Sequence, residues 1–316
     1  MAMAHQTPNG KRAVGVARAR LYEHLRFQLT ARGYLEVETP ALVPAPGLEP
    51  HITAFESEYR PELDPGDARQ LYLHTSPEYA MKRLLAEGFG SIFQICKVFR
   101  NGEVAAAHNP EFTMLEFYRS PGEVFGLMDD LQALVQRAAA QLGCRTAGLD
   151  LQAPFECVTV KEAFRQHAGC APPDDEESFF KIMLSQVEPK LGCERATFLI
   201  EYPAAMASLA RLKPGDPSVS ERFELYAGGV ELANGFGELS DAGEQRRRLV
   251  AEQAQRRAAG RPVYALDERF LDAVGRLPDS AGVAVGLDRL LMLLLGTDRI
   301  AEVLLFPACD EWPPVH

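Results

Sequence analysis

Residues 99–118 read FRNGEVAAAHNPEFTMLEFY, and the interpretation of the whole chain starts from this stretch. Strand-forming apolar runs stand at both ends, and small residues occupy the middle. This order predicts a β-hairpin, in which a loop over residues 102–107 joins two strands. A hairpin of this kind indicates an antiparallel sheet.

The second strand of this hairpin carries an unusual face. Side chains alternate along a strand, so Phe112, Met114, Glu116 and Tyr118 lie on the same side of the sheet. A carboxylate among large apolar groups is costly to bury without a partner. Two interpretations are open: an amphipathic surface hairpin, or a pocket floor that stacks a ring and holds a cation.

The composition is that of a soluble globular protein. The chain has 316 residues, of which 47% are hydrophobic and 24% charged, and its net charge is −11. Its longest basic block is Arg246–Arg248. Because a surface for a polyphosphate needs many cations, an extended nucleic-acid surface is disfavoured.

Cysteine usage and the chain start point to a cytoplasmic protein. The six cysteines are scattered without a CxxC pair, which is typical of reduced thiols and indicates neither a disulfide framework nor a zinc site. The start MAMAHQTPNGKR lacks the apolar core of a signal peptide. The longest apolar run, Leu290–Leu295, is too short to cross a membrane, so we expect no membrane partner.

Hydrophobic periodicity and turn signals predict a single domain over residues 13–316, preceded by a disordered segment over residues 1–12. Ser76 stands where an N-cap would, followed by Pro77 and Glu78. Helices are expected over residues 13–32, 123–142 and 243–259, and strands over 34–40, 70–75 and 91–99. Because strands arrive as hairpins and not as βαβ units, we expect an α+β fold with an antiparallel sheet flanked by helices. Residues 145–222 are mixed and indicate no chemistry.

A second hairpin is predicted in residues 221–241, ERFELYAGGVELANGFGELSD. If Gly228 and Gly229 form a two-residue turn, Tyr226 lies opposite Glu231, and Glu224 shares the face of Tyr226. Carboxylates this close repel each other unless a cation lies between them, and oxygen ligands suit Mg²⁺ bound to phosphates. A solvated edge strand with a ladder of glutamates is the alternative.

A third segment, residues 282–296, runs from a glycine-spaced strand into a buried helix. Gly282 and Gly286 would allow a ligand to approach the strand closely. Arg289, in the first turn of the helix, could hold a phosphate with its planar fork. Taken alone, this pattern also fits an ordinary capped helix.

Together these segments resemble a known family. GYLEVETPAL (33–42), the opening stretch and GVAVGLDRLLML (282–293) are similar to the three signature motifs of class II aminoacyl-tRNA synthetase catalytic domains. HNPEFTMLEFY and ELANGFGEL are specifically similar to lysyl-tRNA synthetases. Because the first motif begins almost at once, with no anticodon-binding domain before it, the chain resembles the elongation factor P lysine ligases. The resemblance implies a homodimer built partly on the segment around Pro40.

The resemblance implies a nucleotide site with ATP and Mg²⁺ as cofactors. Arg100 would hold the α-phosphate and Arg289 would clamp the far side of the nucleotide, as the catalytic residues. Phe112 would stack on adenine, His108 would lie at the pyrophosphate, and Asn109 would lie near the α-phosphate or the amino acid. Further residues that match ATP-binding positions are Asn101, Glu103, Glu231, Leu232 and Gly286.

The same resemblance implies an amino-acid site. The positions that match those receiving the lysine amines are Glu78, Glu116, Tyr118 and Glu238, with Ser76 and Ala284 as further substrate-binding residues. Glu224 and Glu231 match the magnesium ligands.

The chain departs from the lysyl-tRNA synthetase pattern in three places. Gly102 stands where those enzymes usually have a glutamate that contacts adenine, and either Glu103 or backbone groups would take that role. The loop Ala105–Ala107 lacks the usual glycine and basic residue. Ala284 replaces a glycine, and a one-carbon change in a pocket discriminates between ligands by roughly 1–3 kcal/mol. We expect Ala284 to favour (R)-β-lysine.

Three hypotheses about function follow. The first is a ligase that activates (R)-β-lysine or lysine with ATP and transfers it to a lysine of elongation factor P. The second is a minimal lysyl-tRNA synthetase, which the net charge and the alanine loop disfavour. The third is a catalytically silent regulatory paralogue. Candidates for steering a protein partner by charge are Lys82, Arg83 and Arg246–Arg248.

Overall fold

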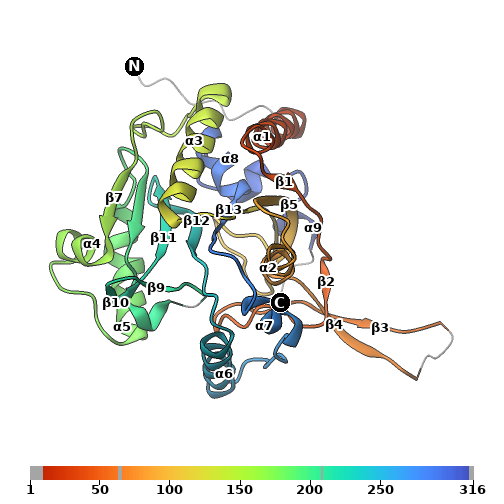
Figure 1. Ribbon diagram of the computed structural model, residues 1–316. Coiled ribbons are helices and arrows are strands. Elements are labelled where there is room, and N and C mark those ends of the chain that lie inside the picture. The colour runs from red at the N-terminus through yellow and green to blue at the C-terminus, as the bar shows by residue number, and fades with distance from the viewer. Residues whose placement is uncertain (1–9, 63–65, 208, 313–316) are drawn as a thin grey trace.

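An eight-stranded sheet forms the centre of the structure, a computed structural model that describes residues 10–62, 66–207 and 209–312 (Figure 1). Its strand order is β1-β5-β6-β13-β12-β11-β8-β7. The six central strands pair antiparallel, and only the edge pairs β1–β5 and β7–β8 are parallel. The strands are β1 (Leu35–Glu36), β5 (Ile92–Phe99), β6 (Glu111–Arg119), β13 (Ala281–Gly286), β12 (Val230–Gly237), β11 (Arg222–Ala227), β8 (Thr197–Ile200) and β7 (Glu156–Thr159). The predicted α+β fold with an antiparallel sheet is confirmed.

One face of the sheet is covered by three helices, α1 (Lys11–Ala31), α3 (Val124–Leu142) and α8 (Leu287–Leu295), which lie together at the top of Figure 1. Leu115 and Phe117 of β6 enter the main apolar core beneath them. Burial of this face supplies most of the hydrophobic stabilisation, because the free energy scales with the apolar area removed from water.

The opposite face is only partly covered. Helices α2 (Glu78–Ala86), α6 (Ala242–Ala258) and α7 (Glu268–Val274) form a smaller core with the loop that follows β2 (Leu42–Val43). The middle of this face, over β6, β13 and β12, stays open toward a cavity. The sheet therefore separates the main core from the candidate site.

The remaining elements extend the two ends of the sheet. Residues 145–222 hold a third apolar cluster around Phe164, Phe179 and Tyr202. The other elements are β3 (Glu56–Tyr59), β4 (Arg69–Leu73), α4 (Val160–His167), α5 (Glu176–Ile182), β9 (Leu212–Lys213), β10 (Asp216–Ser220), α9 (Ala308–Glu311), a π-helical turn (Met183–Val187) and the 3₁₀ turns Glu188–Lys190, Ala204–Met206 and Ile300–Val303. In the described ranges, no helix has the length and apolar character needed to cross a membrane. All six cysteines are free.

The element boundaries differ from the predictions in small ways. Helix α1 begins at Lys11, so the expected disorder is wrong for residues 10–12, while residues 1–9 lie outside the described ranges. Helix α2 begins at Glu78, not Pro77, although the Ser76 hydroxyl accepts a hydrogen bond from the Glu78 amide at 3.0 Å, as an N-terminal cap would. The loop of the first hairpin covers residues 100–110 and is longer than predicted.

The second hairpin has the predicted turn. Gly228 and Gly229 have φ values of 62° and 72°, the left-handed region that a type I′ turn requires and that favours glycine. Tyr226 pairs with Glu231, as the turn predicts. Leu225 pairs with Ala233, so the register shifts there by one residue.

Arg256 of α6 is a buried cation that ties this helix to the loop before β3. Its side chain is fully buried, its Nε donates to the Pro262 carbonyl at 2.6 Å, and its Nη1 donates to the carbonyls of Glu49 and Ile52 at 2.7 Å each. Its guanidinium also lies 4.5 Å from the centre of the Tyr264 ring.

Replacing Arg256 by Met keeps an unbranched apolar stem but removes the guanidinium that donates to the carbonyls of Glu49, Ile52 and Pro262. We expect Arg256→Met to lower the free energy of unfolding by about 3 kcal/mol, measured by urea denaturation. Arg257→Met, at the exposed neighbouring position, is the matched control and should change it by less than about 0.5 kcal/mol. Equal effects of the two substitutions would show that the buried contacts do not hold the loop.

Candidate functional site

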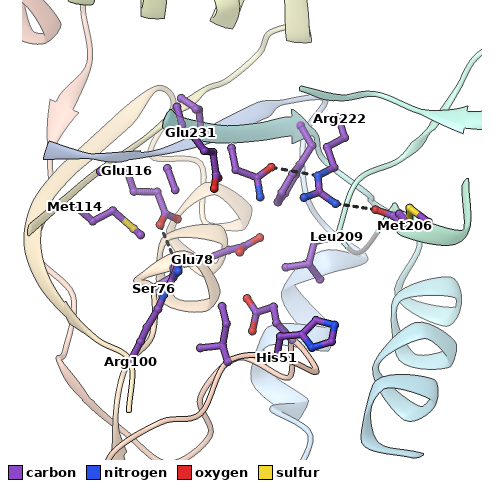
Figure 2. A pocket seen from close by; sticks show the side chains of 18 of the residues that line it. His51, Ser76, Glu78, Arg100, Met114, Glu116, Met206, Leu209, Arg222 and Glu231 are labelled. Carbon is purple, nitrogen blue, oxygen red and sulfur yellow. Dashed lines mark hydrogen bonds between the residues drawn. The ribbon is translucent and has the colours of Figure 1, made fainter. Parts of the chain in front are cut away.

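A cavity of about 640 Å³ opens over the uncovered face of β6, β13 and β12 (Figure 2). Phe112, Met114, Glu116 and Tyr118 all line it. The first hairpin therefore forms a pocket floor, and the alternative of a surface hairpin is wrong. Alternation along β6 produces this result, because Leu115 and Phe117, which stand between Met114, Glu116 and Tyr118, enter the main core.

One end of the cavity is acidic. The Glu116 carboxylate is buried and accepts hydrogen bonds from the Ser76 hydroxyl at 2.6 Å and the Tyr118 hydroxyl at 2.5 Å. Burial, and then the carboxylate of Glu78, raise the pKa of Glu116 to about 8. An ammonium group bound here would relieve that cost, so this end is suited to a ligand amine.

A buried lysine lies beside this acidic end. Lys82 Nζ is 2.6 Å from Glu78 Oε1 and 2.6 Å from Glu238 Oε2, and only 1% of the Lys82 side chain is exposed. The prediction that Lys82 steers a partner from the surface is therefore wrong. Its neighbour Arg83 is partly exposed.

Glu238 stands behind the cavity wall and is not among the residues that line it. Its Oε1 is buried without a hydrogen-bond partner in the described chain. Gly282 separates this oxygen from the cavity, and a Cβ at Gly282 would come within 2.6 Å of it. A side chain at position 282 would therefore clash with the Tyr118 ring and with Glu238.

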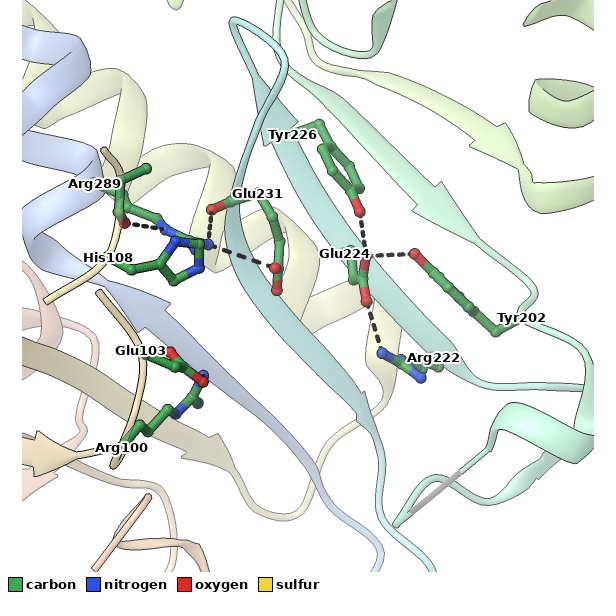
Figure 3. A network of polar contacts seen from close by, with 10 residues as sticks. Arg100, Glu103, His108, Tyr202, Arg222, Glu224, Tyr226, Glu231 and Arg289 are labelled. Atoms are coloured by element: carbon green, nitrogen blue, oxygen red, sulfur yellow. Dashed lines mark hydrogen bonds and ion pairs between the residues drawn. The ribbon is translucent and has the colours of Figure 1, made fainter. Parts of the chain in front are cut away.

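The other end of the cavity is basic (Figure 3). The Arg100 guanidinium lies 5.2 Å from the centre of the Phe112 ring. Arg289 Nη1 donates to the Glu231 carbonyl at 2.9 Å, and Arg289 Nη2 lies 2.6 Å from His108 Nε2. Burial, and then the Arg289 charge, lower the pKa of His108, so the imidazole is neutral and accepts from Arg289. Two fixed guanidinium groups are suited to a polyphosphate.

Figure 3 shows two further carboxylates near this end: Glu231 lies beside Arg289, and Glu224 lies farther away, beside Tyr202 and Tyr226. Glu224 is fully hydrogen-bonded: Oε2 accepts from the Tyr202 and Tyr226 hydroxyls at 2.5 Å each, and Oε1 accepts from Arg222 Nη2 at 2.7 Å. Glu231 lines the cavity, and its Oε2 is 3.5 Å from Arg289 Nη1.

The environment of Glu231 suits a divalent cation. Burial, and then the Glu224 carboxylate, raise the pKa of Glu231. Burial, Glu231 and Glu224 likewise raise the pKa of Glu188 to about 7. This accumulation of negative charge fits a cation bound by Glu231. Glu224 would attract the cation by its negative charge without binding it directly. No cluster of three or more His, Cys, Asp or Glu side chains has metal-binding geometry in the part of the chain that the structure describes.

Two residues at or near the site, Arg222 and Glu188, escaped the sequence analysis. Arg222 lies 4.5 Å from the Tyr202 ring centre and donates to the Met206 carbonyl at 2.9 Å and to Asn234 Oδ1 at 3.3 Å (Figure 2). Glu188 is the second missed residue, because burial and the negative charges of Glu231 and Glu224 raise its pKa. Arg222 lies in the predicted second hairpin, and its spacing of two from Glu224 was a usable signal. Glu188 follows a π-helical turn, and no local pattern marks it.

Of the other predicted site residues, the cavity collects Ser76, Glu78, Glu103, Asn109, Leu232, Ala284 and Gly286. Asn101 is exposed and does not line it. Asn109 uses its amide within the protein, donating to the Glu111 carbonyl at 2.6 Å and accepting from the Ala308 amide at 2.9 Å. Glu103 Oε1 lies 3.9 Å from Arg100 Nη1, near the place where adenine is expected. The ligand roles of these residues stay predictions.

Comparisons with known proteins agree with this geometry. The family of tRNA synthetases class II (D, K and N) matches residues 7–310. The elongation factor P–(R)-β-lysine ligase of Salmonella dublin is 39% identical, covering 92% of this chain and 93% of that protein. The ligase of the same name from Salmonella gallinarum is 40% identical over the same shares.

The raised pKa of Glu116 leads to a prediction about pH. An empty pocket holds a proton on Glu116 below about pH 8, and an ammonium ligand binds the ionised form, so binding releases that proton. We expect the affinity for L-lysine to rise with pH, by roughly tenfold between pH 6.5 and pH 8, as measured by titration calorimetry. Glu116→Gln should remove most of this dependence. A flat profile in the unsubstituted protein would contradict the assignment.

Proposed function

Because this chain belongs to the family of class II tRNA synthetases (D, K and N), we propose that it is an ATP-dependent, AMP-forming ligase. It activates (R)-β-lysine, or lysine, as an aminoacyl-adenylate and transfers it to the ε-amine of a lysine of elongation factor P. The observation that carries the proposal is one cavity with an acidic end for amines and a basic end for phosphates. The names of the two Salmonella relatives support the choice of acceptor.

The first half-reaction needs positioning and charge, not a side-chain nucleophile. The amino-acid carboxylate attacks the α-phosphorus of ATP, and pyrophosphate leaves. Arg100 would stabilise the charge that develops on the α-phosphate, and Arg289 with neutral His108 would hold the far phosphates. Phe112, on the cavity floor below Arg100, would stack on adenine.

Mg²⁺ completes this site in the proposal. Glu231 would hold the ion directly, since its carboxylate faces the cavity. Glu224 would contribute through its field, because three donors already occupy its oxygens. When bound, Mg²⁺ would supply positive charge that offsets the charge of the departing pyrophosphate.

Amine recognition selects the substrate in this proposal. Glu78 and Glu116 face the cavity, and Glu238 lies behind Gly282. Ala284 lies on the cavity face opposite Glu116 in the β13–β6 register. Its methyl group narrows the floor where the amines bind, so a β-amino acid, whose amine is displaced by one carbon, fits this floor better.

The acceptor is a protein amine in this proposal. The amine attacks the adenylate carbonyl, AMP leaves, and the amine loses a proton as the amide forms. A net charge of −11 is a poor match for transfer RNA, and the loop Ala105–Ala107 carries no cation toward it. Arg83, Arg246 and Arg247 remain the surface candidates for steering the protein. Arg248 does not, because its side chain is only 16% exposed and lines the cavity.

A homodimer and a cytoplasmic location are part of the proposal. Phe27, Leu35 and Leu42 are 66%, 52% and 42% exposed, and they come from α1, β1 and β2 on both sides of Pro40 in the sequence. Exposed apolar side chains on neighbouring segments of the chain are typical of a covered interface. Six free thiols suit a reducing compartment.

The acceptor decides between this proposal and a minimal tRNA synthetase. The protein is incubated with ATP, Mg²⁺, (R)-β-lysine or lysine, and either purified elongation factor P or total transfer RNA. We expect intact mass to show one added lysyl group on the protein, and acid-precipitable label to be absent from the RNA. Arg100→Ala, which removes the α-phosphate contact, should abolish the modification. Efficient charging of transfer RNA without protein modification would overturn the proposal.

A further inference from the structure

Lys82 has no task in the activity proposed above, yet it is the only cation in direct ion-pair contact with the acidic end among the residues described. It is fully buried on α2, and its Nζ contacts one oxygen of Glu78 and one of Glu238, at 2.6 Å each. Rings of Phe236 and Phe270 lie 5.2 Å and 5.9 Å from the ammonium. A buried lysine costs free energy unless its charge is compensated, and here two carboxylates and two rings provide this.

In this arrangement the Lys82 ammonium binds some of the carboxylate oxygens and leaves others for the ammonium groups of a ligand. Lys82 holds Glu78 Oε1 and Glu238 Oε2. Glu238 Oε1 remains without a hydrogen-bond partner, next to Gly282 of the cavity wall. Glu78 and Glu238 thus each keep one oxygen that Lys82 does not contact, and the ion pair with Lys82 fixes the orientation of both carboxylates.

The charges in this group can be counted. Ionised Glu78, Glu116 and Glu238 carry three negative charges, and Lys82 carries one positive charge, so two negative charges remain for a ligand. An amino acid such as lysine or β-lysine carries two ammonium groups. Lys82 therefore brings the charge of the pocket into agreement with that of a diamino acid.

We propose that Lys82 is a positioning residue that sets the number of ammonium groups the amino-acid pocket accepts, by neutralising one of its three carboxylates and orienting two of them. The inference rests on the proposed activation of a diamino acid. It adds a residue that does not line the cavity, and it explains why the pocket can hold three carboxylates.

Other charged groups face this cluster and must be considered in its titration. Burial raises the pKa of Glu238, and Lys82 opposes this, as it does for Glu116. Arg211 also lowers the pKa of Glu238, and Glu78 raises it. Burial, Glu49 and Glu78 raise the pKa of Glu252 on α6 to about 8, and Glu78 is also among the charges that act on Glu49. Without the Lys82 charge, Glu116 and Glu238 would bind protons up to a higher pH.

The test is lysine-dependent exchange of pyrophosphate into ATP by the full-length Lys82→Met protein. We expect KM for lysine to rise at least about tenfold at pH 7, while KM for ATP and kcat at saturating lysine change by less than about threefold. The acidic limb of the pH profile of kcat/KM should move up by about one pH unit. Lys82→Arg, which keeps the charge, should retain a profile close to that of the unsubstituted protein.

Two further variants separate charge from packing. Lys97→Met is the matched control, since Lys97 is half-exposed and ion-paired with Glu111 at 3.4 Å outside the pocket, and it should leave all constants unchanged. The double variant Lys82→Met with Glu238→Gln removes one positive and one negative charge. The net charge of the cluster is then minus two, as in the unsubstituted protein. The pH profile of the double variant should return to that of the unsubstituted protein, even if Lys82→Met alone fails to fold.

The outcomes are distinguishable. Unchanged KM and pH profile in Lys82→Met, or a profile in the double variant that stays displaced, would overturn the inference while leaving the proposed function intact. The proposed function itself fails if no amino acid with two ammonium groups supports pyrophosphate exchange by the unsubstituted protein.

Discussion

Along β6 the side chains alternate between two environments with opposite demands. Leu115 and Phe117 enter the main core under α1 and α3, whereas Met114, Glu116 and Tyr118 face the cavity. The period of two along a strand makes these assignments inseparable, because a shift of one residue would bury Glu116 among leucines and expose Phe117 to the ligand. The neighbouring β13 and β12 follow the same register, so the core and the site are fixed together.

Charge is then distributed along the cavity. The acidic end collects carboxylates from α2 and β6 and from the residue after β12, and the basic end collects Arg100 and Arg289 from the loop after β5 and the start of α8. Each end is costly when empty, as the raised pKa of Glu116 and the lowered pKa of His108 indicate. A ligand with amines at one end and phosphates at the other would relieve both costs. The two substrates of aminoacyl-adenylate formation meet this description together, because the diamino acid carries the amines and ATP carries the phosphates.

Much of this arrangement could be predicted from the sequence, because it depends on local periods. The face of β6, the Gly228–Gly229 turn and the Tyr226–Glu231 pair follow from alternation and turn chemistry, and the likeness to class II synthetases added the strand arrangement. Contacts between distant segments were not predictable in this way. Lys82 looked like a surface lysine because nothing in its helix reveals that Glu238 packs against it. Glu224 looked like a free metal ligand because Tyr202 and Arg222 reach it through tertiary packing. Arg256 stands in a highly charged helix, and only its burial distinguishes it from Arg257.

The central claim is that the cavity activates an amino acid that carries two ammonium groups. Amino-acid-dependent exchange of pyrophosphate into ATP, measured with Mg²⁺ for lysine, both enantiomers of β-lysine and norleucine, tests it most directly. Norleucine has the shape of lysine but lacks the side-chain ammonium, so the buried carboxylates would gain nothing from it. The account predicts exchange with (R)-β-lysine, weaker exchange with lysine and none above background with norleucine. Exchange with norleucine at the rate found for lysine would contradict it.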